Sequence, residues 1–345
     1  MTVRTVRILI SSSVACLLLG LYGGLSRMGV LPQLLQHAVQ HHGALMVVGF
    51  LAALIAAERA IALNNLFMNV ASILFSCGGL LLALGFELVT DVLWTGGVLS
   101  FVMWTGWMWL NFPKNFSNLF FTFAAVLLLV GVALFIRGLP SAWYGLAWAG
   151  FFVAFIVGER MDMMKIVNAR PTSYVVAGLS VPTALVGLAF VSKNLIAASF
   201  GLLLFSAARH DVALRLFRRT GFSRYLAFGL GTAYAWLAMS IVLWSLSSSL
   251  DTILHSVFLG FVATMVFTHA PIILPAILKT KHMYSPYLYV PFFMLQAATA
   301  MRIFSAAMLN VGMWSLSGIV TVISVIAFLI LGPVKTLLRK TIYTK

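Results

Sequence analysis

Twelve apolar runs, each near the length that crosses a lipid bilayer, dominate this sequence. A membrane-spanning helix needs about 20 apolar residues. The runs cover residues 8–26, 38–57, 66–86, 92–112, 117–136, 141–158, 173–191, 195–208, 225–246, 252–278, 286–308 and 313–334. In a chain of 345 residues this leaves only short polar connections. The runs predict one integral membrane domain over residues 1–345, an all-α polytopic bundle of about 12 transmembrane helices.

The composition agrees with a chain that faces lipid. Hydrophobic residues make up 62% of the chain and charged residues 8%, whereas soluble domains carry about a quarter charged residues. This excludes a nucleotide-binding module, a secreted enzyme and a soluble nucleic-acid binder. The two cysteines, Cys16 and Cys77, lie inside apolar runs, so the sequence predicts no disulfide framework.

The basic residues predict how the bundle is oriented. With a cytoplasmic N terminus, 18 of the 22 lysines and arginines lie in cytoplasmic connections and tails, as the positive-inside rule requires. We therefore expect both termini in the cytoplasm of a multi-pass protein of a bacterial-type inner membrane. The net charge of +15 is then mainly an orientation signal. Attraction to anionic lipid is a secondary consequence, and we expect no nucleic-acid partner.

Three histidines stand at the predicted outer end of the second run. His37 and His41 have the i, i+4 spacing that places two side chains on one helical face, which suits a metal ion such as copper. His42 points about 100° away, toward a stripe of small residues that favours close helix packing, Gly49, Ala53, Ala56 and Ala60. His42 is therefore the candidate ligand for haem iron or copper inside the bundle. For His37 and His41 an interfacial capping role is the alternative.

The tenth run carries two more histidines. His255 stands at the same predicted outer layer as His42, and His269 lies 14 residues further along, about 21 Å deeper on a straight helix. His255 is the second candidate haem ligand, and His269 is a third candidate metal ligand. Pro271 frees the carbonyl of Phe267 beside His269, which indicates either a packing kink or a polar site.

Arg302, in the eleventh run, lies too deep to face lipid without a fixed anion. One interpretation is a structural ion pair with Asp251. The other is a two-pronged clamp on a haem propionate.

Four acids at the inner ends of the runs lie beside arginines and lysines: Glu58, Glu159, Asp162 and Asp211. Ion pairing at the membrane surface is the favoured interpretation of these acids, and a proton path is the alternative.

Two helices resemble a known family. His41-His42 leads into Met46-Val47-Val48-Gly49-Phe50, and His255 leads into Gly260-Phe261-Val262-Ala263-Thr264-Met265. This pattern, with twelve spans, is similar to the NnrS family of haem- and copper-containing membrane proteins. The resemblance implies a role in the nitric-oxide response. The chain is also distantly similar to the main subunit of haem-copper oxidases, but we do not expect terminal-oxidase chemistry because the sixth and seventh runs contain no histidine.

Three functions compete at this point. The first is a protein that binds haem, and copper as a further cofactor, near the outer face and acts on a small diatomic ligand or with a redox partner. The second is a secondary transporter, which twelve spans favour but which usually needs acidic sites near the midplane. The third is a cofactor-free structural subunit of a membrane complex. The sequence does not decide whether the protein is an enzyme.

Overall fold

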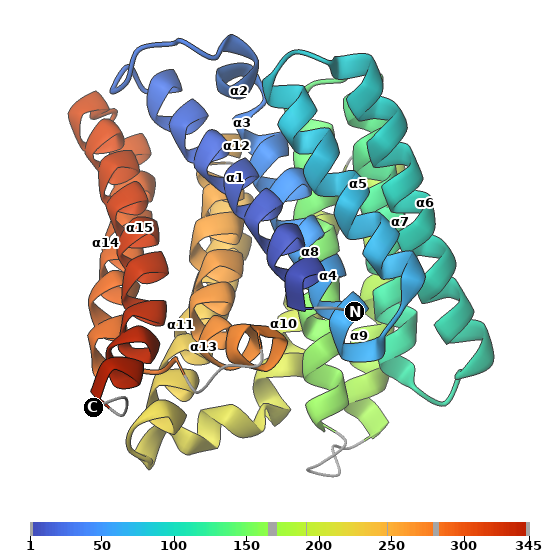
Figure 1. The fold of residues 1–345 in the computed structure, drawn as a ribbon. Coiled ribbons are helices and arrows are strands. Elements are labelled where there is room, and N and C mark those ends of the chain that lie inside the picture. The colour runs from blue at the N-terminus through green and yellow to red at the C-terminus, as the bar shows by residue number, and fades with distance from the viewer. Residues whose placement is uncertain (1–2, 165–170, 191, 247, 279–282, 343–345) are drawn as a thin grey trace.

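The computed structural model describes residues 3–164, 171–190, 192–246, 248–278 and 283–342. Within these residues all the regular structure is helical (Figure 1). A helix hydrogen-bonds its own backbone, so it is the element that an apolar run adopts in lipid. The prediction of an all-α polytopic bundle is confirmed.

The first half of the chain supplies nine helical elements. Their bounds are α1 (Val3–Arg27), α2 (Gln36–Gln40), α3 (His42–Ala44), the π-helical segment η1 (Leu45–Ala52), α4 (Ala53–Leu63), α5 (Leu66–Ala83), α6 (Glu87–Asn111), α7 (Phe116–Ile136) and α8 (Ser141–Met164). The predicted second run is thus a composite of α2, α3, η1 and α4.

The second half of the chain is likewise built from helical elements. Its elements are α9 (Pro171–Ala189), α10 (Lys193–His210), the 3₁₀ helix η3 (Val212–Arg218), α11 (Phe222–Ser245), α12 (Leu250–His255), the π-helical segment η4 (Ser256–Ala263), α13 (Thr264–Leu278), the 3₁₀ helix η5 (Pro286–Leu288), α14 (Tyr289–Ala307) and α15 (Val311–Ile342). The predicted tenth run is a composite of α12, η4 and α13.

Eleven helical spans among the described residues are long and apolar enough to cross a membrane. They correspond to eleven of the twelve predicted runs. The eighth run forms the helix α10, but polar residues occupy both ends of its 18 residues, Lys193, Asn194, Arg209 and His210. α10 packs against α8, α9 and α11.

Neighbouring helices in sequence are neighbours in space. The largest contacts join α5 to α6, α7 to α8, α9 to α10 and α14 to α15. Figure 1 shows α1 crossing the front of the bundle, and the start of α1 and the end of α15 both lie in its lower half. We call the opposite end, which carries His37, Glu87 and Asp251, the outer end, following the predicted orientation.

Small residues let the helices of the second run pack closely. The backbones of Gly49 in η1 and Gly79 in α5 approach so closely that a Cβ on Gly79 would lie 2.9 Å from the Gly49 Cα. The remaining small residues of the predicted stripe, Ala53, Ala56 and Ala60, are fully buried. The stripe therefore forms a helix contact, as predicted.

Pro271 lies inside α13. Pro271 cannot donate to the carbonyl of Phe267, and the Tyr225 hydroxyl donates to that oxygen at 3.0 Å. A buried hydroxyl on the neighbouring helix α11 thus satisfies the carbonyl that Pro271 leaves free.

Candidate functional site

Two histidines and one glutamate meet at the outer end of the bundle. The His37 Nδ1 and the His41 Nε2 each lie 3.3 Å from the same oxygen, Glu87 Oε1. One ligand atom from each residue falls within a group whose members are all within 4.8 Å of one another. We call His37, His41 and Glu87 the His37 cluster.

Local backbone structure builds this cluster. α2 begins at Gln36, so His37 and His41 lie on one helical turn, and the His41 amide donates to the His37 carbonyl at 2.9 Å. Their rings stack with centroids 6.5 Å apart. The predicted shared face of the two histidines is confirmed.

The turn before α6 brings the carboxylate to the histidines. Gly85 has φ +91°, and a Cβ there would lie 2.9 Å from the His37 Nε2. A larger residue at position 85 would thus strain the backbone and displace the His37 imidazole. Glu87 then stands in the first turn of α6, beside α2.

The donor set suits a transition-metal ion. Imidazole nitrogen and carboxylate oxygen bind zinc, copper and iron at about 2.0–2.2 Å, which separates neighbouring ligand atoms by about 2.8–3.1 Å in octahedral geometry and about 3.3–3.6 Å in tetrahedral geometry. The two histidine-to-glutamate distances of 3.3 Å already match this spacing. Asp91, one turn further along α6, adds negative charge near Glu87 and His41.

An aromatic cluster lies behind His41. The Phe135 ring contacts the His41 imidazole edge-on at 5.6 Å, and it also contacts Tyr144 at 5.5 Å and Trp148 at 5.9 Å. Tyr144 and Trp148 are themselves 4.8 Å apart. These rings form a low-dielectric wall on the bundle side of the His37 cluster.

A second polar group, at the same end, is built around Asp251. Arg302 donates to both of its carboxylate oxygens, from Nε at 3.0 Å and from Nη2 at 2.7 Å. The Arg302 guanidinium also lies 4.8 Å from the centre of the Trp314 ring. The predicted ion pair is confirmed. We call Asp251, His255 and Arg302 the Asp251 cluster.

His255 is fixed by its own helix. Its Nδ1 lies 2.7 Å from the Asp251 carbonyl oxygen, so Nδ1 carries the proton and Nε2 keeps its lone pair. This is the orientation in which a histidine ligates a metal.

His42 lies beside this cluster but is oriented differently. The Arg27 Nη1 lies 3.3 Å from the His42 Nδ1. Because arginine can only donate, Nδ1 accepts this bond and the proton of a neutral His42 is on Nε2. The charges of Asp251, His255 and Arg302 also act on the His42 imidazole, which places the two predicted haem ligands in one electrostatic environment.

These contacts test the fit of a haem between His42 and His255. His255 presents a free Nε2, as iron requires. His42 has one nitrogen accepting from Arg27 and the other protonated, so it presents no lone pair. Both prongs of Arg302 hold Asp251 rather than being free for a propionate. In this arrangement His255 can ligate a haem iron, whereas His42 and Arg302 are not available to hold the haem.

His269 lies far from the other candidate metal ligands, in the inner half of the tenth span. Its Nδ1 donates to the Met265 carbonyl at 2.8 Å, and its buried Nε2 has no hydrogen-bond partner among the described residues. The nearby charge is the cation Arg160. In the described part of the chain, the group of three side chains that could hold a metal ion is the His37 cluster. His269 does not belong to it.

At the inner end the structure confirms the predicted ion pairing for Glu159. Glu159 in α8 accepts a hydrogen bond from Arg59 in α4. The Arg59 guanidinium also lies over the rings of Phe121 and Phe155. Asp162 accepts from the Ser117 hydroxyl at 2.6 Å, and Asp211 from the Tyr234 hydroxyl at 2.7 Å. Lys165 and Arg170 lie outside the described residues.

Sequence reasoning found His37 and His41 but missed their partner Glu87, and it missed the contact of Arg27 with His42. A residue 46 positions away reaches His41 only because α5 and α6 turn back at Gly85. The signal available in the sequence was an acid directly after a Gly-Phe turn at the predicted outer surface.

The fold and its outer polar groups define a polytopic helical membrane protein with a candidate metal centre. The chain belongs to the family described as Domain of unknown function (DUF8744), which it matches over residues 4–336. Searches of curated proteins and of solved structures returned no match.

Proposed function

We propose that this protein binds a transition-metal ion at the outer end of its bundle through His37, His41 and Glu87. The observation that carries the proposal is the pair of equal distances, 3.3 Å, from two imidazole nitrogens to one carboxylate oxygen. Three protein ligands leave a fourth position for water or a small molecule. The cluster is accessible from outside, with 43%, 22% and 54% of the three side chains exposed.

The surroundings favour a redox or small-ligand role over transport. A copper ion at this site would exchange electrons or bind a diatomic molecule at its open position, and Tyr144 and Trp148 lie within two ring contacts of His41. A transported ion would need a site near the midplane, whereas the His37 cluster lies at the helix ends. The resemblance of the second and tenth spans to the NnrS family supports the same assignment, in a bacterial-type inner membrane.

Metal titration of the purified, metal-stripped protein tests this proposal. We expect one Cu²⁺ or Zn²⁺ ion per chain in the wild type and a loss of at least 100-fold in affinity in His37→Ala/His41→Ala. The matched control is His42→Ala/His255→Ala, which also removes two histidines from the outer end and keeps the affinity. Equal losses in the two double variants would refute the assignment. Absence of Cu²⁺ and Zn²⁺ binding to the wild type would also refute it.

Haem ligation by His255 is the second candidate function, and the hydrogen bond from its Nδ1 to the Asp251 carbonyl supports it. A second axial ligand from His42 requires that Arg27 leave the His42 Nδ1. A visible spectrum of the purified protein tests this. A Soret band that His255→Ala removes and His37→Ala keeps supports haem, and a spectrum without such a band refutes it.

A further inference from the structure

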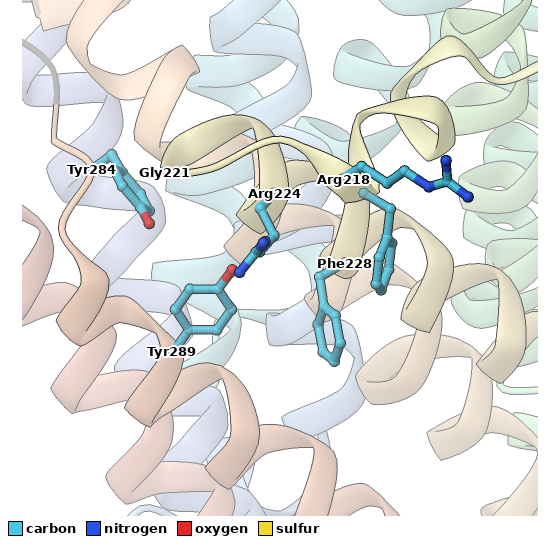
Figure 2. Close-up of a pocket in the computed structure, with 7 residues that line it drawn as sticks. Arg218, Gly221, Arg224, Phe228, Tyr284 and Tyr289 are labelled. Atoms are coloured by element: carbon cyan, nitrogen blue, oxygen red, sulfur yellow. The ribbon is translucent and has the colours of Figure 1, made fainter.

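A pocket of about 680 Å³ opens at the inner end of the bundle, far from the His37 cluster. It lies between η3, the start of α11 and the start of α14 (Figure 2). Its lining residues are Phe217, Arg218, Gly221, Arg224, Phe228, Tyr284 and Tyr289. Pockets of this size hold a small organic ligand or the head group of a larger one.

The charge of the pocket is positive. Arg218 and Arg224 line it, and none of its described lining residues is acidic. The Arg224 Nε donates to the Arg219 carbonyl at 2.9 Å, which holds the guanidinium in place while using one of its five N–H groups. Figure 2 shows Arg224 extending toward Tyr289, whereas the Arg218 side chain extends in the opposite direction, away from Tyr289. An anion is therefore the complementary ligand.

The walls of the pocket are aromatic and continue toward the lipid. The Phe228 ring contacts Phe217 at 5.7 Å and Phe293 at 5.5 Å. Phe293 stacks on Tyr289 with centroids 6.0 Å apart. Phe217 and Phe293 are each 50% exposed, and Val290 is 56% exposed. A ligand whose charged end meets Arg224 would thus find an apolar surface for its remaining part along α11 and α14.

We propose that this pocket binds the head group of an anionic phospholipid, with an acyl chain along Phe228 and Phe293. A phosphate group accepts the two-pronged hydrogen bonds that arginine donates. The pocket lies at the end of the bundle where most lysines and arginines gather, and anionic lipids concentrate in the cytoplasmic leaflet that such an end faces. Free phosphate would satisfy the arginines but leave the aromatic wall without a ligand.

Lipid binding to the delipidated full-length protein in non-ionic detergent tests the proposal. The probes are a short-chain phosphatidylglycerol, phosphatidylcholine of the same chain length, and inorganic phosphate. We expect phosphatidylglycerol to bind at least tenfold more tightly than phosphatidylcholine, and inorganic phosphate not to displace it at equal concentration. We expect Arg224→Gln to lower the phosphatidylglycerol affinity at least tenfold, as loss of a charge-assisted contact does.

Arg215→Gln is the matched control, because Arg215 belongs to η3 and is exposed but does not line the pocket. It removes the same charge and should change the affinity less than twofold. Equal losses in Arg224→Gln and Arg215→Gln would overturn the proposal in favour of general electrostatic attraction. Displacement by inorganic phosphate would identify a free-anion site instead. If Arg224→Gln does not fold, Arg218→Gln replaces it with the same expected direction, and unchanged affinity there would overturn the proposal.

Discussion

The two histidine clusters at the outer end of the bundle differ in how their charge is balanced. In the Asp251 cluster the carboxylate is held by both prongs of Arg302, a residue whose side chain is 5% exposed. In the His37 cluster the described ion-pair contacts of the carboxylate are with two imidazoles, and all three side chains are at least partly exposed. A carboxylate that already holds a cation stabilises the fold, whereas one that contacts two imidazole rings can take a metal ion.

The largest effect should follow from breaking the balanced cluster. Asp251→Ala leaves Arg302 without its anion, and an unpaired buried charge is costly. Because the Asp251 side chain is 48% exposed, we expect a loss of about 2–3 kcal/mol in the free energy of unfolding rather than the larger value of a fully buried pair. Thermal and denaturant unfolding in detergent measure it.

The double variant Asp251→Ala/Arg302→Met is the control for this first prediction. It removes both charges and should recover at least half of the loss. A double variant less stable than Asp251→Ala would contradict the ion-pair interpretation.

The corresponding substitution in the His37 cluster should weaken metal binding without lowering the stability of the fold. Glu87→Gln keeps the size of the side chain but removes its charge, so we expect a loss of about 10- to 100-fold in Cu²⁺ affinity. Stability without metal should change by less than about 0.5 kcal/mol, as for other exposed substitutions. A stability loss as large as that of Asp251→Ala would remove the distinction between the clusters.

The membrane spans and the Arg302–Asp251 ion pair could be predicted from the sequence, for simple physical reasons. Apolar run length determines a span, and a buried arginine needs an anion, for which Asp251 on an adjacent span was the nearest candidate. The His37–Glu87 contact depends on the rotation of α6 about its axis and on the conformation of Gly85, which run length does not determine. Arg27 reaches His42 because α1 packs against α3, a pairing that the apolar pattern does not encode.

A smaller effect separates the two roles considered for Arg302. Arg302→Lys keeps the charge but loses the planar fork that holds both Asp251 oxygens, so we expect a loss of about 1 kcal/mol in stability. Any haem spectrum should stay the same in this variant. A shifted haem potential or lower haem occupancy with unchanged stability would support the propionate clamp instead.

The smallest effect concerns the ring beside Arg302. Trp314→Leu removes the aromatic face but keeps an apolar side chain, and we expect a loss of about 0.5–1 kcal/mol from the cation–π contact. The same substitution should have no further effect in the Asp251→Ala/Arg302→Met background, where the guanidinium is gone. An equal loss in both backgrounds would assign the effect to packing alone.

Pulsed electron paramagnetic resonance of the Cu²⁺-loaded protein tests the central claim most directly, because it counts the imidazole nitrogens bound to copper. The structure predicts two histidine ligands in the wild type, one in His41→Ala, and two in His255→Ala. A signal that His41→Ala leaves unchanged, or that His255→Ala reduces by one histidine, would contradict the assignment of the metal to His37, His41 and Glu87.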